Sequence, residues 1–212
     1  MRKLSVVGLL LALAVCGAVT AAPALARNFQ CQNQTLGATT VVGNLVVPYG
    51  AYCDLNGTHV TGNAEVDPTA GLLSDQGATI DGNVHVAHNG QFAEFNGSTV
   101  GGNLQCDQCS VADVDNSAVN GNLDDNALNQ GAIIQTSHIG GNLHIHNATD
   151  AGFGFQITNN TIGGDLEFDH NTGAADISNN TIAKKLDCNG NTPPPTGGGN
   201  TAQQKQGQCA ML

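Results

Sequence analysis

The sequence predicts an all-β protein: a single-domain parallel β-helix solenoid of about eight to nine coils, with roughly 20 residues in each coil. Three observations predict this fold class. A short motif recurs at nearly constant spacing, apolar and polar residues alternate around it, and no segment has helical periodicity. Stacked coils of short strands with one buried face account for all three observations.

The repeated motif is [VI]-x-G-N-[LV]-x-[VI], with substitutions in some copies. Its eight copies begin at Val41, Val60, Ile80, Val100, Val119, Ile139, Ile162 and Ile182. Successive copies begin about 20 residues apart, and the one longer step lies between Ile139 and Ile162. A period of this length and regularity is typical of a solenoid, in which each copy marks one coil.

The second half of the motif predicts a strand with one buried face. Its first position forms an apolar column of Leu45, Ala64, Val84, Leu104, Leu123, Leu143, Leu166 and Leu186. Two residues later lies a second apolar column of Val47, Val66, Val86, Cys106, Ile145, Phe168 and Cys188. The position between the two columns is polar in every copy except that of Val46, and this alternation is the period of a half-buried strand.

A second strand is expected upstream in each coil. A further apolar column there consists of Leu36, Leu55, Phe95, Val114, Ile134, Ile157 and Ile177. Turn residues such as Asn56-Gly57-Thr58 follow it before the next copy of the motif. Each coil should therefore contain two or three short strands joined by Asn/Gly turns.

On these repeats the chain resembles the right-handed parallel β-helix proteins of bacteria, and its short coils are similar to those of bactofilins. The segment CNGNTPPPTGGGNT and the later GQC also resemble the tail of uncharacterised secreted bacterial proteins built on GGNL-type repeats. The resemblance covers about residues 34–209. It implies a right-handed fold and export, and it implies no catalytic residues.

The Gly-Asn pair of the motif predicts a structural corner of the coil. Representative pairs are Gly102-Asn103, Gly141-Asn142 and Gly164-Asp165. We expect glycine there because a residue without Cβ permits a tight or left-handed turn. We expect the stacked asparagine amides to form hydrogen bonds from coil to coil. A phosphate-binding loop would need a helix after the glycines, and no helical pattern follows them.

The chain divides into three segments. Residues 1–26 have the pattern of a signal peptide, with Arg2 and Lys3 before an apolar run and Ala24-Leu25-Ala26 as the cleavage site. Two alternatives are a lipoprotein anchored through Cys16 and an uncleaved membrane anchor. Residues 27–191 carry the β-helix repeats, and residues 192–212 form a Pro/Gly-rich segment with a C-terminal capping coil. We therefore expect a secreted or cell-surface protein with no transmembrane segment after signal cleavage.

The charge of the exported chain limits its partners. Removing residues 1–26 removes two of the six Lys/Arg residues and none of the 17 Asp/Glu residues, which leaves a formal charge of −13. Nucleic acid, anionic polysaccharides and anionic lipids are disfavoured, because binding to phosphates and similar groups depends on Lys and Arg. Cations, neutral glycans of the cell wall and surface proteins remain as partners, and no cofactor is expected.

Six cysteines follow the signal segment, and an even number in an exported chain predicts disulfides. Cys31 and Cys53 lie near the start of the repeats, and Cys188 and Cys209 lie near the end. The two members of each pair are separated in sequence by close to the length of one coil. We therefore predict that each pair stacks and joins one terminal coil to its neighbour.

Two residues of the second apolar column are unusual. Cys106 forms a C-x-x-C pair with Cys109, and its inward position favours a local disulfide or a buried thiol over metal ligation, since no second cysteine pair accompanies it. Asp125 occupies a position that otherwise holds Val, Ile, Phe or Cys. We expect this coil to shift its register so that Leu128 fills the core; the alternative is a partly buried carboxylate with a perturbed pKa.

Imidazoles and carboxylates occur at the polar positions of neighbouring coils. Asp124, His144 and Glu167 occupy one position in three successive copies, and His146 aligns with Asp169. Because coils lie about 4.8 Å apart, these five side chains are expected to lie close together on the outer surface. The simpler interpretation is a solvated polar ridge. The alternative is a site for a divalent transition metal, for which imidazole is a suitable ligand.

Catalysis is not favoured by the sequence. Polysaccharide lyases of β-helix shape use Arg or Lys, but after residue 26 Arg27 is the only arginine, and the first lysine is Lys184. Hydrolases use clustered carboxylates, and Asp124-Asp125 is the only pair of acids adjacent in sequence. We predict a secreted or cell-surface structural or binding protein. The alternatives are a small carbohydrate-active β-helix enzyme (a lyase or hydrolase) and a cation-binding surface protein.

Overall fold

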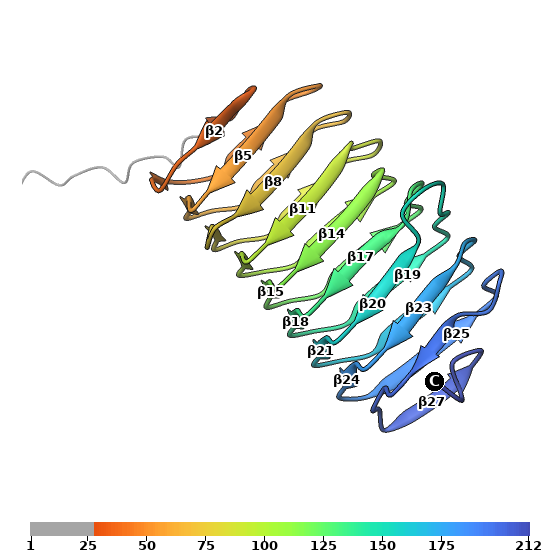
Figure 1. Ribbon diagram of the computed structural model, residues 1–212. Coiled ribbons are helices and arrows are strands. Elements are labelled where there is room, and N and C mark those ends of the chain that lie inside the picture. Colours follow the sequence, from red (N-terminus) through yellow and green to blue (C-terminus); the bar gives the residue numbers. More distant parts are fainter. Residues whose placement is uncertain (1–27) are drawn as a thin grey trace, which may run out of the picture.

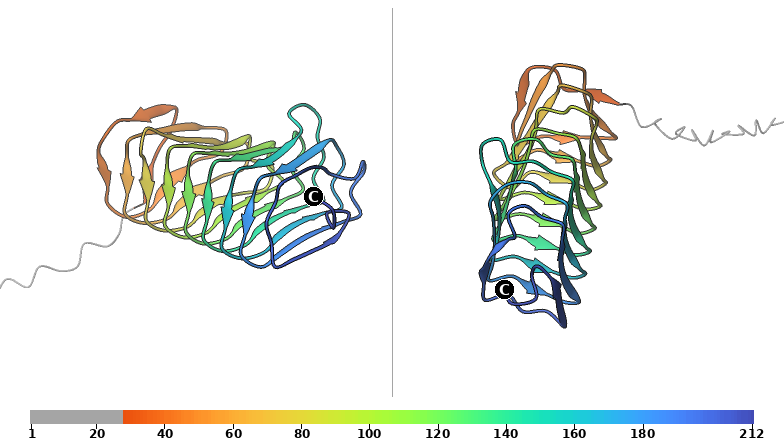
Figure 2. Two further views of the ribbon diagram at one scale, coloured as in Figure 1. Left: turned by 60° about the horizontal axis from the view of Figure 1, so that its bottom comes forward. Right: turned by 90° about the vertical axis from the view of Figure 1, so that its right-hand side faces the viewer.

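Each repeat contributes three short strands, one to each of three parallel sheets that run along the molecule (Figures 1 and 2). The computed structural model describes residues 28–212, which form a parallel β-solenoid of about nine turns of about 20 residues without any helix. The predicted fold class is therefore confirmed. No helix capable of crossing a membrane is found within these residues. The predicted signal peptide, Cys16 and Arg27 lie outside the described residues.

The three sheets are named A, B and C. Sheet A contains β1 (Phe29–Gln30), β4 (Leu45–Val47), β7 (Ala64–Val66), β10 (Val84–Val86), β13 (Leu104–Asp107), β16 (Leu123–Asn126), β19 (Leu143–His146), β22 (Leu166–Asp169), β25 (Lys185–Asn189) and β27 (Gln204–Gly207). Sheet B contains β2 (Gln34–Leu36), β5 (Tyr52–Asn56), β8 (Gly71–Asp75), β11 (Phe92–Asn96), β14 (Val111–Asp115), β17 (Ala132–Gln135), β20 (Phe155–Thr158), β23 (Ala175–Ser178) and β26 (Thr196–Gly198). Sheet C contains β3 (Thr40–Val41), β6 (His59–Val60), β9 (Thr79–Ile80), β12 (Thr99–Val100), β15 (Ala118–Val119), β18 (His138–Ile139), β21 (Thr161–Ile162) and β24 (Thr181–Ile182).

The predicted apolar columns are the core of the solenoid. Leu143 is paired with Leu123 in the preceding coil and with Leu166 in the next, and all three side chains are fully buried. The first residue of each motif lies in sheet C and supplies a fourth inward column. Burying a side chain of this size contributes about 1.5–3 kcal/mol, so the repeated columns are the main source of stability.

Asp125 does not behave as the sequence analysis expected. It stays in register with Cys106 and Ile145, and its side chain is 0% exposed. Leu128 is also buried, but it comes from the turn after β16 and not from a shifted strand. Both carboxylate oxygens of Asp125 lack a hydrogen-bond partner. Burial, together with the charge of Asp124, raises the pKa of Asp125 well above its ordinary value, so the folded protein favours the neutral carboxyl.

The Gly-Asn corner joins sheet C to sheet A and contains a ladder of hydrogen bonds. The backbone N–H of Asn103 donates to Oδ1 of Asn83 at 2.8 Å, and the N–H of Asn122 donates to Oδ1 of Asn103 at the same distance. Asp165 continues the ladder, because a carboxylate oxygen accepts the same bond from the N–H of Lys185 at 3.0 Å. The ladder therefore uses backbone donors and side-chain acceptors, and the asparagine amides link successive coils through their oxygens.

The reason for glycine at this corner differs from the prediction of a left-handed turn. Among the motif glycines only Gly43 has a positive φ, of 100°. At Gly102 a Cβ would collide with Oδ1 of Asn83, and Gly141 stands in the same relation to Oδ1 of Asn122. Glycine is required there because the ladder of asparagine side chains passes too close for a Cβ, and not because the backbone is left-handed.

Left-handed residues occupy other corners. After the strands of sheet B, a positive φ recurs at one position in successive coils, for example at Asn116 (46°), Thr136 (53°), Asn159 (60°) and Asn179 (58°). Asparagine tolerates this conformation better than other residues with a side chain. Thr136 is therefore the unfavourable member of the group.

Buried asparagines form an inner ladder that the sequence analysis did not predict. Nδ2 of Asn160 donates to the carbonyl of Ile134 at 2.7 Å, and Nδ2 of Asn180 donates to the carbonyl of Ile157 at the same distance. The backbone N–H of Asn160 donates to Oδ1 of Asn180 at 3.0 Å. These side chains satisfy backbone groups that the turn would otherwise leave buried without partners.

The three cysteine pairs lie at disulfide distance. The Cα atoms are 5.6 Å apart for Cys31–Cys53, 5.8 Å for Cys106–Cys109 and 5.3 Å for Cys188–Cys209. The first and third pairs each connect a terminal coil with its neighbour as predicted, but their cysteines are not stacked in register, since Cys53 is paired with Gln34 and Cys188 with Gly207. The second pair lies at the distance of the local disulfide that was one of two expectations. All three pairs are consistent with an oxidising environment.

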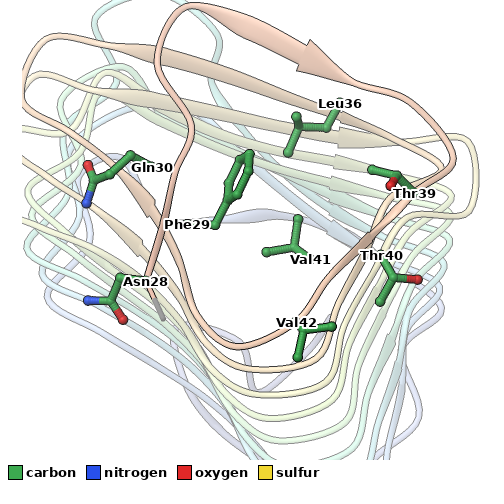
Figure 3. A pocket seen from close by; sticks show the side chains of 8 residues that line it. All are labelled: Asn28, Phe29, Gln30, Leu36, Thr39, Thr40, Val41 and Val42. Carbon is green, nitrogen blue, oxygen red and sulfur yellow. The ribbon is translucent and has the colours of Figure 1, made fainter. Parts of the chain in front are cut away.

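The two ends of the described solenoid differ. At the first coil a cavity of about 530 Å³ opens between β1 and β3, and Phe29 and Val41 point into it (Figure 3). At the other end β27 pairs with β25, and Leu212 packs partly against the core. The Pro/Gly-rich segment does not interrupt the solenoid, since its Thr196–Gly198 forms β26 and pairs with β23.

Candidate functional site

The outward face of sheet A carries a continuous line of mostly polar side chains, which we call the A strip. In chain order its residues are Val46, Glu65, His85, Gln105, Asp124, His144, Glu167, Asp187 and Gln206. Each is paired with its neighbours in the adjacent coils, because the motif keeps one register throughout. The predicted alternation places these side chains outward while the flanking columns are buried.

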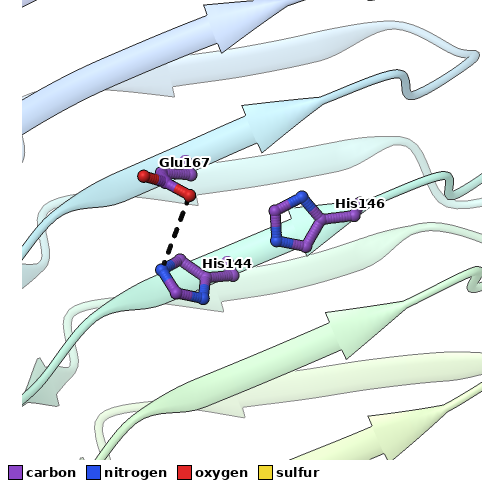
Figure 4. A group of neighbouring side chains, drawn as sticks. All are labelled: His144, His146 and Glu167. Atoms are coloured by element: carbon purple, nitrogen blue, oxygen red, sulfur yellow. Dashed lines mark ion pairs between the residues drawn. The ribbon is translucent and has the colours of Figure 1, made fainter.

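Three of the five residues proposed from sequence as metal ligands come together on the outward face of sheet A. His144 and His146 project from the same face of β19, and Glu167 approaches them from β22 (Figure 4). One potential ligand atom from each residue lies within 4.8 Å of those of the other two. The imidazole centroids are 5.4 Å apart, with an interplanar angle of 54°. We call these three residues the imidazole–carboxylate cluster.

His144 lies between two carboxylates. Its Nδ1 is 2.7 Å from Oδ1 of Asp124, and its Nε2 is 3.7 Å from Oε2 of Glu167. An ionised carboxylate only accepts hydrogen bonds, so Nδ1–H of His144 donates the hydrogen bond that Asp124 accepts. In the neutral imidazole the lone pair is then on Nε2, which faces Glu167.

The other two predicted ligands have different positions. Asp124 contacts the far nitrogen of His144 and so lies behind the imidazole as seen from Glu167. Asp169 is paired with His146 in register, but its Oδ1 accepts a hydrogen bond from the backbone N–H of Asn189 at 2.8 Å. Asp124 is therefore placed to orient His144, and Asp169 is committed to the backbone of the next coil.

Lys185 lies at the edge of the cluster. Its Nζ is 3.4 Å from Oε1 of Glu167 and 3.0 Å from Oδ2 of Asp187. The hydrogen bond to Asp187 is the main cause of the raised pKa of Lys185. Glu167 therefore directs one oxygen to Lys185 and the other toward His144.

The other histidines on or near the A strip make different contacts. Nδ1 of His85 lies 2.9 Å from Glu65, and its Nε2 lies 3.6 Å from Asp107, so carboxylates face both ring nitrogens. His88 and His170 are exposed residues of the turns that follow β10 and β22. Among residues 28–212 the cluster of His144, His146 and Glu167 is the only group that has a metal-ligand arrangement.

Sheet B carries a second polar feature, which the sequence analysis missed. A hollow of about 260 Å³ lies on its outward face and is lined by Leu73, Asp75, Glu94, Phe95, Asn96, Asp113, Asp115, Ile133 and Gln135. We call it the B hollow. Glu94 and Asp113 are directly paired across β11 and β14, although a full coil of the chain separates them in sequence. The sequence signal for this pair is the period of the repeat, because Glu94 and Asp113 occupy the same position in successive coils. The two acids are not adjacent in sequence.

The carboxylates of the B hollow are not neutralised by nearby cations. Within residues 28–212 the lysines are Lys184, Lys185 and Lys205, and none of them lies in sheet B. Burial, followed by the charges of Glu94 and Asp115, raises the pKa of Asp113 to about 6. One buried oxygen each of Asp75 and Asp113 has no hydrogen-bond partner.

Two aromatic rings lie beside the hollow. Tyr52 and Phe92 are both partners of Gly71 in register, one from each neighbouring coil. Their centroids are 6.0 Å apart, and a Cβ at Gly71 would collide with the ring of Phe92. The glycine therefore lets the two half-exposed rings approach each other on the outer surface.

No protein-family model matches this chain, and no curated protein or solved structure matches it either. The parallel β-solenoid is observed directly, whereas the resemblance to secreted GGNL-type and bactofilin-like proteins stays a prediction.

Proposed function

We propose that this protein is an exported structural and binding module without catalytic activity, and that it binds a neutral carbohydrate chain on the outward face of sheet B. Export is supported by the signal-like residues 1–26 and by three cysteine pairs at disulfide distance. The observation that carries the binding proposal is the B hollow beside the Tyr52–Phe92 pair.

The chemistry of this face fits sugar rings. Aromatic and aliphatic groups pack against the C–H faces of a sugar, and carboxylate and amide oxygens accept hydrogen bonds from its hydroxyl groups. Leu73 and Ile133 in the hollow and Phe92 beside it supply the apolar contacts, while Glu94, Asp115 and Gln135 line the hollow with polar side chains that can accept. An anionic glycan is excluded by the same carboxylates, because no lysine within residues 28–212 lies in sheet B.

The test is binding of the secreted protein to defined neutral glycans. Soluble gluco- and chito-oligosaccharides would be titrated by calorimetry, and insoluble forms would be used for co-sedimentation. We expect at least one of them to bind, and Phe92→Ala to weaken the binding at least about tenfold through lost stacking. Gln105→Ala, an exposed change on sheet A, is the matched control and should have no effect. Failure of all neutral glycans to bind, or equal binding by Phe92→Ala, would reject the proposal.

One observation favours a second candidate function, a small carbohydrate-active hydrolase. A carboxyl group with a raised pKa next to an ionised carboxylate is the arrangement that supplies an acid and a base for glycoside hydrolysis. Asp113 has a raised pKa and is paired in register with Glu94. Release of reducing sugar, abolished by both Asp113→Asn and Glu94→Gln, would favour the hydrolase. Binding without product release would favour the module.

A further inference from the structure

The imidazole–carboxylate cluster lies on sheet A, apart from the B hollow of sheet B. The distances between its potential ligand atoms are close to those found around a bound metal ion. Ligands on one zinc ion, each at about 2.0–2.2 Å from the metal, lie roughly 3–4 Å from one another. Nε2 of His144 and Oε2 of Glu167 are already 3.7 Å apart. His146 lies on the same strand as His144, and its ligand atom completes a set of three whose members lie within 4.8 Å of one another.

His144 is already oriented for coordination. Asp124 accepts the Nδ1–H of His144 at 2.7 Å, which fixes the tautomer that has its lone pair on Nε2. Metal-ligating histidines commonly donate their other N–H to a carboxylate, which sets the ring orientation and increases the basicity of the ligand. Asp124 is thus a positioning residue, and Glu167 is the carboxylate ligand.

The local charge also favours a cation. Glu167 belongs to the cluster, Asp124 and Asp187 lie beside it, and Lys185 is the only lysine in contact with it among the described residues. The ammonium of Lys185 lies closer to Asp187 than to Glu167, at 3.0 Å against 3.4 Å. Glu167 therefore keeps an oxygen directed toward His144.

The ligand types select the class of metal. Two imidazoles and one carboxylate suit zinc, cobalt, nickel or copper, whereas calcium and magnesium require oxygen ligands. Three protein ligands leave at least one coordination position open to solvent. We propose that His144, His146 and Glu167 bind one divalent transition-metal ion of the zinc class on the outward face of sheet A, with Asp124 holding His144 in the binding orientation.

The experiment is a titration of the metal-free protein with zinc chloride by calorimetry near pH 7.5. We expect one zinc ion per chain at micromolar concentration, and His144→Gln/His146→Gln should lower the affinity at least about 100-fold. The matched control is His85→Gln/His88→Gln, which removes two imidazoles from sheet A and its turn in another coil. This control should bind zinc like the native protein. Circular dichroism and the melting temperature without metal establish that both variants are folded.

Cobalt(II) provides a second measurement. The visible absorption of cobalt bound to the native protein should show coordination by nitrogen and oxygen, and added zinc should remove this absorption by displacing cobalt. The Glu167→Gln variant should not show this absorption. The proposal is overturned if zinc binds only at millimolar concentration, if the control variant loses as much affinity as the cluster variant, or if calcium competes equally. Because Phe92 and the B hollow lie on sheet B, loss of glycan binding and loss of zinc binding are independent results.

Discussion

Oδ1 of Asp124 lies 2.7 Å from Nδ1 of His144, on the opposite side of the imidazole from Glu167. This hydrogen bond links two successive coils and determines which nitrogen of His144 is available to a metal. We therefore expect Asp124→Ala to lower the zinc affinity by about 10–100-fold, the usual effect of removing such a carboxylate. Nitrogen chemical shifts of the His144 ring should show the second tautomer becoming populated.

The control for this prediction is Asp107→Ala. Asp107 faces His85 at 3.6 Å but has no role in the cluster, so its removal should leave zinc affinity unchanged. Unchanged zinc affinity in Asp124→Ala, with His144 still in one tautomer, would show that Asp124 does not position the imidazole.

Replacing Asp125 with valine should stabilise the protein. The carboxyl group is completely buried and without hydrogen-bond partners, and valine is the residue that other coils place in this column. We expect a gain of about 1–3 kcal/mol in the free energy of unfolding at pH 7, the usual cost of an unsatisfied buried polar group. Urea denaturation of the native protein and of Asp125→Val measures this gain.

The effect of Asp125 depends on pH in a defined direction. Its pKa is raised in the folded protein, so above the unfolded value of about 3.9 the unfolded chain releases a proton that the folded protein keeps. This group therefore lowers the stability of the native protein as pH rises above about 4. The difference between Asp125→Val and the native protein should grow from pH 4 to pH 7. A constant difference over this range would contradict the burial of an unpaired carboxyl.

The corner ladder predicts that two substitutions of Asn103 differ in their effect on the free energy of unfolding. Asn103→Ala removes the acceptor of the Asn122 N–H and should lower stability by about 1 kcal/mol. Asn103→Asp keeps an acceptor oxygen, as Asp165 does in a later coil, and should be nearly neutral. Equal losses in the two variants, measured by urea denaturation, would mean that the hydrogen bond is not the relevant interaction.

Thr136 gives a prediction for the left-handed corner. Its φ is 53°, a conformation that is costly for a β-branched residue, whereas Asn116 and Asn159 occupy the same position in the neighbouring coils. Thr136→Asn should therefore raise the free energy of unfolding by about 1 kcal/mol. Thr99→Asn, in a strand of sheet C, is a control that should bring no gain. A loss of stability in Thr136→Asn would contradict the assigned backbone conformation.

The disulfides can be mapped directly. Peptide mass spectrometry of the unreduced protein should recover Cys31 linked to Cys53, Cys106 to Cys109, and Cys188 to Cys209. Replacing Cys188 and Cys209 with serine should increase hydrogen exchange in β27, the last strand of sheet A, more than in the central β16. A link between Cys31 and Cys209 would contradict the connection of each terminal coil with its neighbour.

Local chemistry in the sequence was sufficient to predict the solenoid. Strand residues alternate between two faces, so the motif alone placed Leu143 and Ile145 inward and His144 outward. Because the period is nearly constant, the same positions of successive copies are stacked, and this predicted the neighbours of His144. Cys31 and Cys53 lie in neighbouring coils but at different positions, since Cys53 is paired with Gln34. These features depend only on residue order within one coil and on the length of that coil.

The tertiary structure decided what depends on contacts between coils. The sequence favoured a register shift at Asp125, but shifting a strand by one residue would turn Leu123 outward and expose a core side chain. Burying one neutral carboxyl group costs less free energy than exposing Leu123. Similarly, Glu94 and Asp113 meet only because β11 and β14 are paired, and Nε2 of His144 faces Glu167 only because Asp124 holds the other nitrogen. Alternation along one strand determines which face a side chain occupies, but its hydrogen-bond partner in the next coil is set by the packing of whole coils.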